Sequence, residues 1–302
     1  MKRLFIIYNP RSSRYLEVRD QVLLRAKELS GYLVGKYEIA ATSIEDNVAQ
    51  LSKLLGNHDL VLSAGGDATA IIAANAIMRS GKDVTLSVLP YGNFNDLSRT
   101  LRTKSFDDVF LSDNSTRKFY PLEIIVDGQL FRYSTCYVTV GMMAESVGLY
   151  NEPGMRRKLK KRFGRQITSY TELAKWYFKN RRNRIFLPEF QLNGALQPKN
   201  TSDYAAVNGR SMARVMKGGE DYRDPKYFRH KTDHLTNFYR LMKLISKSIF
   251  SRIPGSATDG DVLEFVNPST VAVQAEGEGK VFENIKTIEI RKSKKCLKVI
   301  EN

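Results

Sequence analysis

The sequence has few of the residues that mark several protein classes. Its two cysteines, Cys136 and Cys296, lie in apolar segments without metal-ligand spacing, which argues against a disulfide framework or a zinc site and favours a reducing cytoplasm. With only three histidines in the chain, His-centred catalysis is not expected. No apolar run approaches the roughly 18 residues that a membrane-spanning helix needs. These shortages exclude the integral membrane class.

The composition that remains is ordinary for a globular protein, with 42% hydrophobic and 26% charged residues, so the disordered class is excluded as well. Because domains cluster at roughly 100–150 residues, a chain of 302 residues predicts two domains. The net charge is +16, and residues 155–184 hold twelve basic residues and one acid, Glu172. A cluster of this kind indicates contact with nucleic acid or with an anionic membrane surface.

The first 120 residues alternate strand and helix patterns, which predicts a parallel α/β sheet. Strands are expected at residues 4–8, 37–42, 60–63 and 84–89, and helices at residues 17–29, after the capping-box pattern at residues 43–46, and at residues 68–78. Beyond Tyr120 the dipeptides Asp127-Gly128 and Asn193-Gly194 predict hairpins. The second domain is therefore expected to be mostly β, with helical interruptions at residues 155–179 and 235–250.

Three loops follow strands of the first domain, at residues 8–13, 64–69 and 89–97. Because the carboxyl ends of parallel strands meet at one edge of a sheet, these loops are expected to line one crevice. Gly65 and Gly66 would let backbone N–H groups approach a phosphate at a helix N-terminus. Asp67 beside them suggests Mg²⁺-nucleotide or general-base chemistry, with helix capping as an equally weighted alternative. In the third loop Asn95 and Asp96 could bind a base or ribose, but the local sequence alone favours Asp96 as the cap of the following helix.

The spacing of these residues resembles a known family. Asn9-Pro10-x-Ser12, Gly65-Gly66-Asp67-x-Thr69 and Pro90-x-Gly92-x-x-Asn95-Asp96 are similar, in this order, to the motifs of the diacylglycerol kinase catalytic domain, which bacterial lipid kinases, sphingosine kinases and ceramide kinases share. Near the end of the chain, Glu276-Gly277-Glu278 resembles the family's Asp-Gly-Glu motif. NAD kinase has a similar Gly-Gly-Asp motif, but assignment to that enzyme would leave the basic segment at residues 155–184 unexplained.

The resemblance implies an α/β + β fold. An N-terminal doubly wound α/β nucleotide-binding domain would span residues 1–120 and be completed by about residues 287–302. A β-sandwich lipid-substrate domain would span residues 121–286, with a basic helical insertion at residues 155–184. The implied reaction transfers the γ-phosphoryl group of ATP, with Mg²⁺, to the hydroxyl of diacylglycerol and gives phosphatidic acid. A kinase of a sphingoid base, ceramide or polyprenol, or an inactive nucleotide- or lipid-binding relative, is the alternative.

The resemblance also implies roles for individual residues. Glu278 would be the general base toward the lipid hydroxyl, with Asp67 as a second catalytic carboxylate. Asp67 and Asp96 would be the Mg²⁺ ligands. The implied nucleotide-binding residues are Asn9, Ser12, Gly65, Gly66, Asp67, Thr69, Pro90, Gly92, Asn93, Asn95 and Asp96.

Several positions depart from the family pattern. Ala68 and Ser13 stand where glycines are usual, Asn93 and Phe94 replace Thr-Gly, and Glu276 replaces an aspartate. Ala68 adds a β-carbon where the backbone would need to approach a phosphate or adopt a positive φ. These changes leave open an altered nucleotide preference or impaired catalysis. Because the motif carboxylates are retained, an active enzyme is the favoured interpretation.

The basic segment has its own alternatives. Basic residues mixed with aromatic ones suit an anionic bilayer interface, single-stranded nucleic acid or a solvated helix face. A lipid kinase acts at a membrane, so the resemblance favours a cytoplasmic, peripherally membrane-associated enzyme with a lipid substrate and without a nucleic-acid partner. A homodimer is left open. The residues expected to face the anionic surface are Arg156, Arg157, Lys158, Lys160, Lys161 and Arg162.

Overall fold

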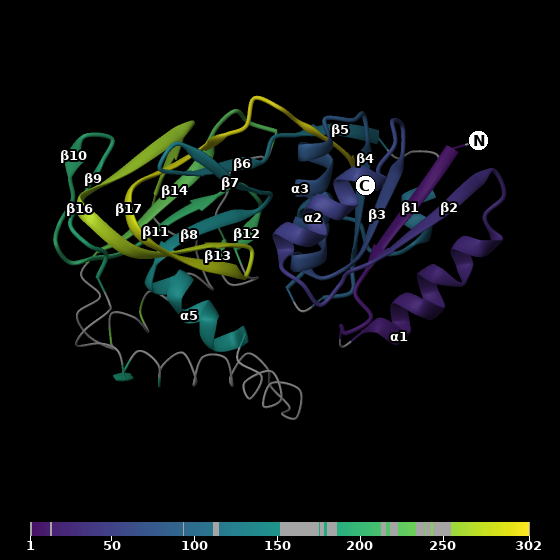
Figure 1. Ribbon diagram of the computed structural model, residues 1–302, viewed down its shortest axis with the longest axis horizontal. Coiled ribbons are helices and arrows are strands. Elements are labelled where there is room, and N and C mark those ends of the chain that lie inside the picture. The colour runs from purple at the N-terminus through teal and green to yellow at the C-terminus, as the bar shows by residue number, and fades with distance from the viewer. Residues whose placement is uncertain are drawn as a thin grey trace.

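The computed structural model describes residues 2–12, 14–92, 94–110, 115–151, 175, 178–179, 186–212, 216–217, 223–233, 239, 243 and 255–301. Two sheets lie side by side, each at the centre of one domain, and both chain ends lie in the first domain (Figure 1). Within the described residues, no helix is long and apolar enough to cross a membrane.

The first sheet has the strand order β2-β1-β3-β4-β18-β5. Five of its strands are parallel, and β5 pairs antiparallel with β18. The strand bounds are β1 Lys2–Tyr8, β2 Tyr32–Glu38, β3 Leu60–Gly65, β4 Thr85–Pro90, β5 Ser115–Phe119 and β18 Leu297–Glu301. The final strand therefore completes the N-terminal sheet. The preceding strand, β17, stays in the second sheet as far as Lys292, so the chain returns to the first sheet after that residue.

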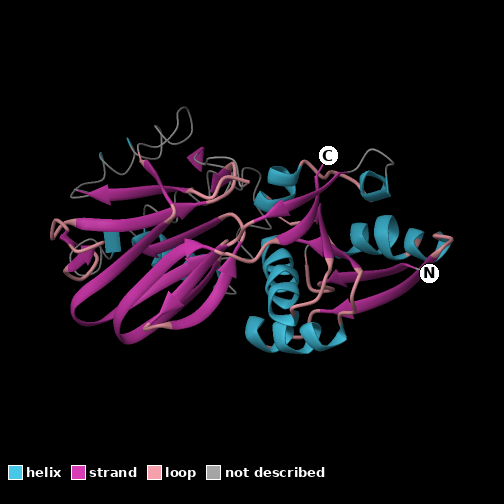
Figure 2. Cartoon of the chain, turned by 90° about the horizontal axis from the view of Figure 1, so that it is seen from above, coloured by secondary structure: helices cyan, strands magenta, loops and turns pink. Residues whose placement is uncertain are grey.

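Helices cover both faces of the first sheet, as Figure 2 shows. On one face α2 and α3 pack in a cluster with Val61 and Val88, and on the other face Val18 and Val22 pack in a cluster with Leu62. The Ser43 side chain accepts a hydrogen bond from the Asp46 backbone N–H at 3.0 Å, which confirms the predicted helix start. The bounds are α1 Tyr15–Val18, a π turn Arg19–Leu23, 3-10 turns Arg25–Glu28 and Asp107–Phe110, α2 Ile44–Leu54, α3 Asp67–Ser80 and α4 Asp96–Leu101.

The second sheet follows the order β15-β14-β11-β8-β16-β17-β6-β7, and β9 pairs with β16 and β10. Its strands are β6 Leu122–Val126, β7 Gln129–Ser134, β8 Tyr137–Gly141, β9 Phe190–Leu192, β10 Ala195–Leu196, β11 Thr201–Val207, β14 Tyr227–Asp233, β15 Ser256–Thr258, β16 Gly260–Ala275 and β17 Glu278–Lys292. A separate pair is formed by β12 Ser211–Met212 and β13 Met216–Lys217, and α5 spans Met142–Asn151.

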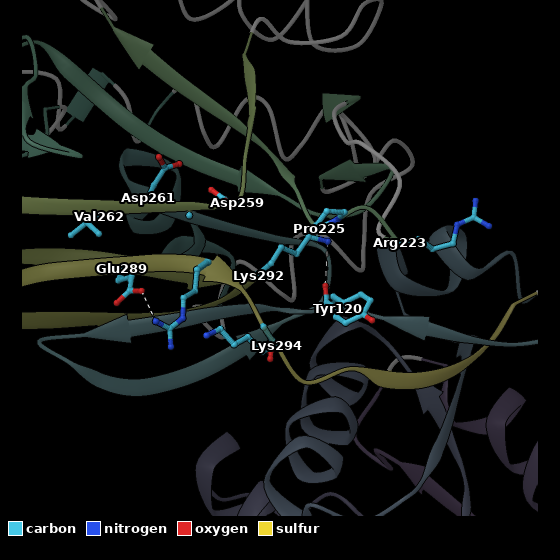
Figure 3. Close-up of a pocket in the computed structure, with 12 residues that line it drawn as sticks. Tyr120, Arg223, Pro225, Asp259, Asp261, Val262, Glu289, Lys292 and Lys294 are labelled. Carbon is cyan, nitrogen blue, oxygen red and sulfur yellow. Dashed lines mark hydrogen bonds and ion pairs between the residues drawn. The ribbon is translucent and has the colours of Figure 1, made fainter.

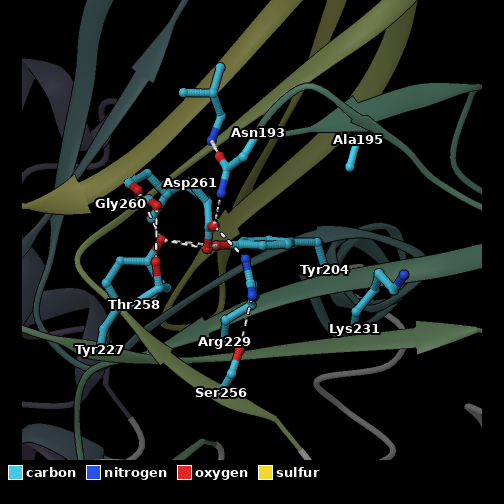
Figure 4. Close-up of polar contacts among 12 residues, drawn as sticks. Asn193, Ala195, Tyr204, Tyr227, Arg229, Lys231, Ser256, Thr258, Gly260 and Asp261 are labelled. Atoms are coloured by element: carbon cyan, nitrogen blue, oxygen red, sulfur yellow. Dashed lines mark hydrogen bonds and ion pairs between the residues drawn. The ribbon is translucent and has the colours of Figure 1, made fainter.

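The long strand β16 joins two layers of this domain. Residues 263–265 of β16 pair with β9, whereas residues 273–275 pair with β8. The buried Asp261 accepts hydrogen bonds from Tyr204 at 2.8 Å and Tyr227 at 2.9 Å, and also from Arg229 and Asn193 (Figure 4). These partners come from β11, β14 and the β9–β10 turn, so the network ties the two layers together. Parallel strands in the N-terminal sheet and a large antiparallel sheet confirm the predicted fold class.

The structure confirms the two predicted hairpin turns, whereas one predicted strand lies at other residues. Both predicted hairpin turns have left-handed backbone, with φ of 47° and 78° at Asp127-Gly128 and of 52° and 78° at Asn193-Gly194. The strand predicted at residues 37–42 is wrong in position, because β2 spans Tyr32–Glu38. As an edge strand with mostly half-exposed side chains, β2 has a weak apolar pattern. The helices expected at residues 155–179 and 235–250 lie almost entirely outside the described residues.

Candidate active site

The three predicted loops meet at one edge of the first sheet. Strands β1, β3 and β4 are neighbours, and their carboxyl ends are in register, with Tyr8 opposite Ala64 and Gly65 opposite Pro90. The loops are also joined directly: Arg14 donates a hydrogen bond to the Pro90 carbonyl at 2.7 Å, and the Tyr91 N–H donates to the Gly65 carbonyl at 3.0 Å. The convergence expected from the sequence is present.

The glycines of two loops are required by backbone contact between the loops. A β-carbon on Gly92 would overlap with the Gly66 α-carbon, and a β-carbon on Gly66 would lie 3.0 Å from the Gly92 α-carbon. A β-carbon on Gly65 would overlap with the Thr69 side chain, which is almost fully buried beside it. All three glycines therefore serve packing within the site, whatever ligand the loops bind.

Asp67 joins the second loop to the third. One carboxylate oxygen accepts a hydrogen bond from the Asn95 N–H at 3.0 Å, and the other accepts one from the Asp96 N–H at 2.8 Å. Asp67 therefore caps α4, whereas its sequence position had suggested capping of its own helix, α3.

The side chains of Asn9 and Asn95 are engaged with their own loops. Asn95 has left-handed backbone with a φ of 57°. Its amide oxygen accepts from the Gly92 N–H at 2.7 Å, and its amide nitrogen donates to the Gly92 carbonyl at 2.9 Å. Asn9 accepts from the Arg11 N–H at 3.0 Å. Both amides thus shape the loops, and Asn95, which is 5% exposed, offers little surface to a ligand.

Other groups at this edge suit an anion. The N-cap residue of α3 is Gly66, which has no side chain to cap the helix. The start of a helix attracts anions through its N–H groups and its dipole. The Ser12 hydroxyl is buried and has no hydrogen-bond partner among the described residues. A polar atom in that state is costly unless a ligand or water satisfies it. This edge therefore fits a phosphate-bearing ligand.

Two of the substitutions relative to the family pattern have a visible outcome. Ala68 lies in the first turn of α3 and is absent from the residues with positive φ, so its β-carbon causes no backbone strain. Phe94 is 43% exposed beside the third loop. Ser13 and Asn93 lie outside the described residues, as do the six basic residues at 156–158 and 160–162.

The second domain reaches this edge along one face of α3. Asn75 and Tyr133 exchange hydrogen bonds, and Arg79 donates to the Phe131 carbonyl at 3.2 Å, so successive turns of α3 lie against β7. One turn nearer the loops, Ile71 belongs to the same buried cluster as Ala275 of β16. Ala275 pairs with Glu278 across the β16–β17 hairpin, and paired residues share a face of the sheet. Glu278 therefore shares a face of the hairpin with Ala275, and its carbonyl accepts from Arg132, which also donates to Glu45 of α2 in the first domain.

Glu276 was noted in the sequence only as a departure from the family pattern, and the structure gives it a prominent place. Its carboxylate is 5% exposed and accepts hydrogen bonds from the Thr135 hydroxyl at 2.8 Å, the Ser134 hydroxyl at 3.0 Å and the Cys136 N–H. Burial raises the pKa of Glu276 to about 7; these hydrogen bonds oppose the shift, and the nearby charge of Asp67 adds to it. The Glu-Gly dipeptide could have indicated a tight turn, but nothing in the sequence pointed to the partners.

The donors present fit Mg²⁺ only together with a ligand. Within the described part of the chain, no group of three or more His, Cys, Asp or Glu side chains could hold a metal ion. Asp67 and the buried Asp96 are adjacent, since the Asp96 N–H bonds to Asp67. Mg²⁺ commonly binds through one or two carboxylates plus substrate phosphates, so Asp67 and Asp96 are the candidate ligands at this edge.

A separate groove lies away from this site. It has a volume of about 670 Å³ and is bounded by Tyr120 and Lys294, on the two chain segments that cross between the domains, and by Asp259 and Glu289 of the sandwich (Figure 3). None of the residues predicted for the nucleotide or for catalysis lines it. The groove is therefore distinct from the loop cluster.

Comparison with known proteins agrees with the geometry. Residues 3–124 match the family model of the diacylglycerol kinase catalytic domain. A diacylglycerol kinase of Staphylococcus saprophyticus is 30% identical over 164 residues, which are 49% of this chain and 51% of that protein. A diacylglycerol kinase of Staphylococcus aureus strain JH9 is 30% identical over 161 residues, which are 49% and 50% of the two chains. In these alignments the chain spans about half the length of the curated relatives it matches.

Solved structures share the whole fold. A crystal structure of a diacylglycerol kinase from Bacillus anthracis strain Sterne covers 100% of this chain and 97% of its own, with a TM-score of 0.67 at 16% identity. A second structure from that organism gives a TM-score of 0.70 at the same identity and coverage. Residues 3–124 are thus similar to the diacylglycerol kinase catalytic domain, as the motifs had suggested, and the whole chain shares the fold of these solved structures.

Proposed function

We propose that this protein is a lipid kinase that transfers the γ-phosphoryl group of ATP to the hydroxyl of diacylglycerol and gives phosphatidic acid. The observation on which the proposal rests is the meeting of three motif loops at one sheet edge, together with a Glu278 hairpin that Arg132 joins to α2 of the same domain. Phosphoryl transfer requires mainly alignment, neutralisation of phosphate charge and a proton acceptor for the alcohol. The two sides of this site supply groups suited to those tasks.

The nucleotide is proposed to bind at the loop edge. The start of α3, capped only by a glycine, and the buried Ser12 hydroxyl, which has no partner among the described residues, suit its phosphates. The close contact between Gly66 and Gly92 holds the second and third loops together at this edge. The predicted nucleotide contacts of Asn9 and Asn95 are then indirect, because their amides hold the loops in shape.

Asp67 and Asp96 are proposed to hold Mg²⁺ together with the phosphates of the nucleotide. When bound, the ion would neutralise phosphate charge and bring the phosphoryl group into line. Asp67 keeps its two backbone hydrogen bonds in this role, so the ion site and the loop geometry would depend on the same side chain.

Glu278 is proposed to accept the proton of the lipid hydroxyl. The hydroxyl oxygen forms a bond to the γ-phosphorus, the bond from that phosphorus to the bridging oxygen of ADP breaks, and the hydroxyl proton moves to the Glu278 carboxylate. The bond from Arg132 to the Glu278 carbonyl, with Arg132 also paired to Glu45 of α2, supports this role because it ties the hairpin to the first domain. The lipid would therefore approach from the side of the second domain.

The test is transfer of labelled γ-phosphate from MgATP to diacylglycerol, ceramide, sphingosine and polyprenol in anionic mixed micelles. Glu278→Gln is assayed beside Glu283→Gln, a matched change at an exposed position of the same strand. We expect labelled phosphatidic acid from the wild type and Glu283→Gln, and a loss of at least about 100-fold with Glu278→Gln. Label in another lipid of the panel would show that this lipid, and not diacylglycerol, is the acceptor. Nucleotide binding without transfer to any lipid would replace the kinase with a binding protein.

Peripheral membrane association is proposed from the charge of residues 155–184. Each basic residue near an anionic surface contributes about 1 kcal/mol of attraction, and this attraction weakens within a Debye length as salt is added. The protein should sediment with vesicles containing phosphatidylglycerol, and less so in high salt. Equal binding to phosphatidylcholine vesicles would contradict the proposal.

A further inference from the structure

We propose that Glu276 is a positioning residue that holds the β16–β17 hairpin so that Glu278 faces the loops of the first domain. The inference rests on the proposed function, because it assigns a partner to the proposed general base. The two carboxylates are separated by one glycine at the end of the hairpin. They have different surroundings: Glu276 is buried, and Glu278 is half-buried.

The backbone of this turn is unusual for a glutamate. Glu276 has a φ of 48° and Gly277 a φ of 87°, which together form a tight two-residue turn with left-handed backbone. Glycine, asparagine and aspartate are the residues that favour the first position of such a turn, whereas glutamate is rarely found there. A backbone conformation of this kind persists when surrounding contacts impose it.

The contacts that impose it come from the turn between β7 and β8. One oxygen of Glu276 accepts three hydrogen bonds, from the hydroxyls of Ser134 and Thr135 and from the Cys136 N–H. The other oxygen is buried and has no partner among the described residues. A carboxylate that served stability alone would be expected to satisfy both oxygens. The three hydrogen bonds to one oxygen instead fix the turn at Glu276-Gly277 against the turn between β7 and β8.

The β7–β8 turn is in turn fixed against the rest of the protein. Asn208 donates to the Thr135 carbonyl at 2.8 Å and to the Tyr120 carbonyl at 3.0 Å, and so binds the turn to the crossing between the domains. Asn75 binds the adjacent Tyr133 to α3. The anchor therefore runs from α3 through β7 and its turn to Glu276. Because α3 begins at Asp67, the same helix sets the position of both sides of the site.

Arg132 supports the hairpin from a second direction. It is 6% exposed, its guanidinium donates to Glu45 of α2 at 2.5 Å, and it reaches the Glu278 carbonyl at 3.5 Å. The guanidinium also lies over the Phe131 ring, with 4.7 Å to the ring centre. The backbone of Glu278 is thereby held between an anchored turn and a buried arginine that is paired with the first domain.

The experiment compares Glu276→Ala, Glu276→Gln and Glu278→Gln, with Glu283→Ala as the control on the same strand. In the micelle assay with MgATP and diacylglycerol, Glu276→Ala should lower kcat by about 100-fold, the loss expected from a misplacement of about 1 Å. Its affinity for ATP should change by less than about twofold, because the nucleotide loops stay intact. Glu276→Gln keeps an amide oxygen that can accept two of the three hydrogen bonds, so it should keep activity within about fivefold of wild type.

A positioning role and a chemical role give different results in this set. If Glu276→Gln lost as much activity as Glu278→Gln, Glu276 would act as an acid or base itself and the inference would be wrong. An unchanged kcat in folded Glu276→Ala would also overturn it. Failure of the wild type to phosphorylate any lipid would instead count against the proposed function.

Hydrogen exchange tests the anchor independently of activity. The backbone amides of residues 277–280 should exchange at least about tenfold faster in Glu276→Ala than in wild type. The amides of α3 should exchange at the wild-type rate in Glu276→Ala, and all of these amides should do so in Glu283→Ala. Equal exchange of this hairpin in Glu276→Ala and wild type would show that Glu276 does not hold it, whatever the assay with lipid gives.

Discussion

Asn75 of α3 and Tyr133 of β7 exchange two hydrogen bonds, each 2.8 Å long, across the boundary between the domains. The Asn75 amide pairs with the backbone of Tyr133 as a neighbouring strand would. Around this pair, buried side chains of α3 such as Ala73 and Ile77 share a cluster with Tyr137 of β8 and Val207 of β11. The helix that presents the glycine loop is therefore built into the interface with the second domain.

Replacing Asn75 with alanine should destabilise the protein by about 3 kcal/mol, because a buried N–H and a buried carbonyl of Tyr133 would both lose their partner. Urea-induced unfolding measures the change in the free energy of unfolding. Gln129→Ala, an exposed change at the start of the same strand, should stay within about 0.5 kcal/mol of wild type. Equal midpoints for the two variants would show that the Asn75 pair contributes little.

Gly92→Ala should disturb the site because its β-carbon would overlap with the Gly66 backbone. We expect a loss of about 2 kcal/mol in stability, typical of overpacking, together with at least tenfold weaker ATP binding by calorimetry. Gly260→Ala is the matched control, since its β-carbon would lie 3.5 Å from that of Arg291, an ordinary contact. If Gly92→Ala bound ATP with wild-type affinity, ATP binding would not depend on the close contact between the Gly66 and Gly92 loops.

Asp67→Asn tests whether one carboxylate organises two loops. The amide has a single acceptor oxygen, so either the Asn95 or the Asp96 N–H would face an amide NH₂ group instead. The variant should bind ATP at least about tenfold more weakly even without Mg²⁺, because the loops themselves lose order. Asp20→Asn, an exposed change in the first domain, should bind ATP normally. A defect seen only with Mg²⁺ present would limit Asp67 to metal binding.

The pKa of Glu276 predicts a pH dependence of stability. Burial raises this pKa from 4.5 to about 7, so the folded protein binds a proton that the unfolded chain releases between those values. The contribution of Glu276 to stability is therefore fully present below pH 4.5 and is lost as the pH rises toward 7. The loss is about 3 kcal/mol, at 1.4 kcal/mol for each pH unit.

Unfolding of wild type and Glu276→Gln in urea from pH 4 to pH 8 measures this difference. Other groups titrate in both proteins, so the stability of wild type relative to the variant isolates Glu276. That difference should decline as the pH rises. A difference that stays constant across this range would show that the Glu276 pKa is close to that of an ordinary glutamate.

The parts of the fold that follow from local patterns were predictable. The Ser43 cap, the Asp127-Gly128 and Asn193-Gly194 turns and the strands around the glycine loops depend on neighbouring residues and on hydrophobic periodicity. The meeting of the loops followed from a general property of parallel sheets. The strand expected at residues 37–42 was misplaced because an edge strand buries few side chains and so has a weak pattern.

What the sequence alone determined is the inventory of the site: its glycines, its carboxylates and their order on strands that end at one edge. Only the tertiary structure decided what those groups do for one another. Asp67 bonds to backbone groups 28 and 29 residues away, and Glu276 bonds to a turn about 140 residues away. Such partners are chosen by packing between elements, which depends on the whole set of buried contacts and leaves no periodic trace in the residues themselves.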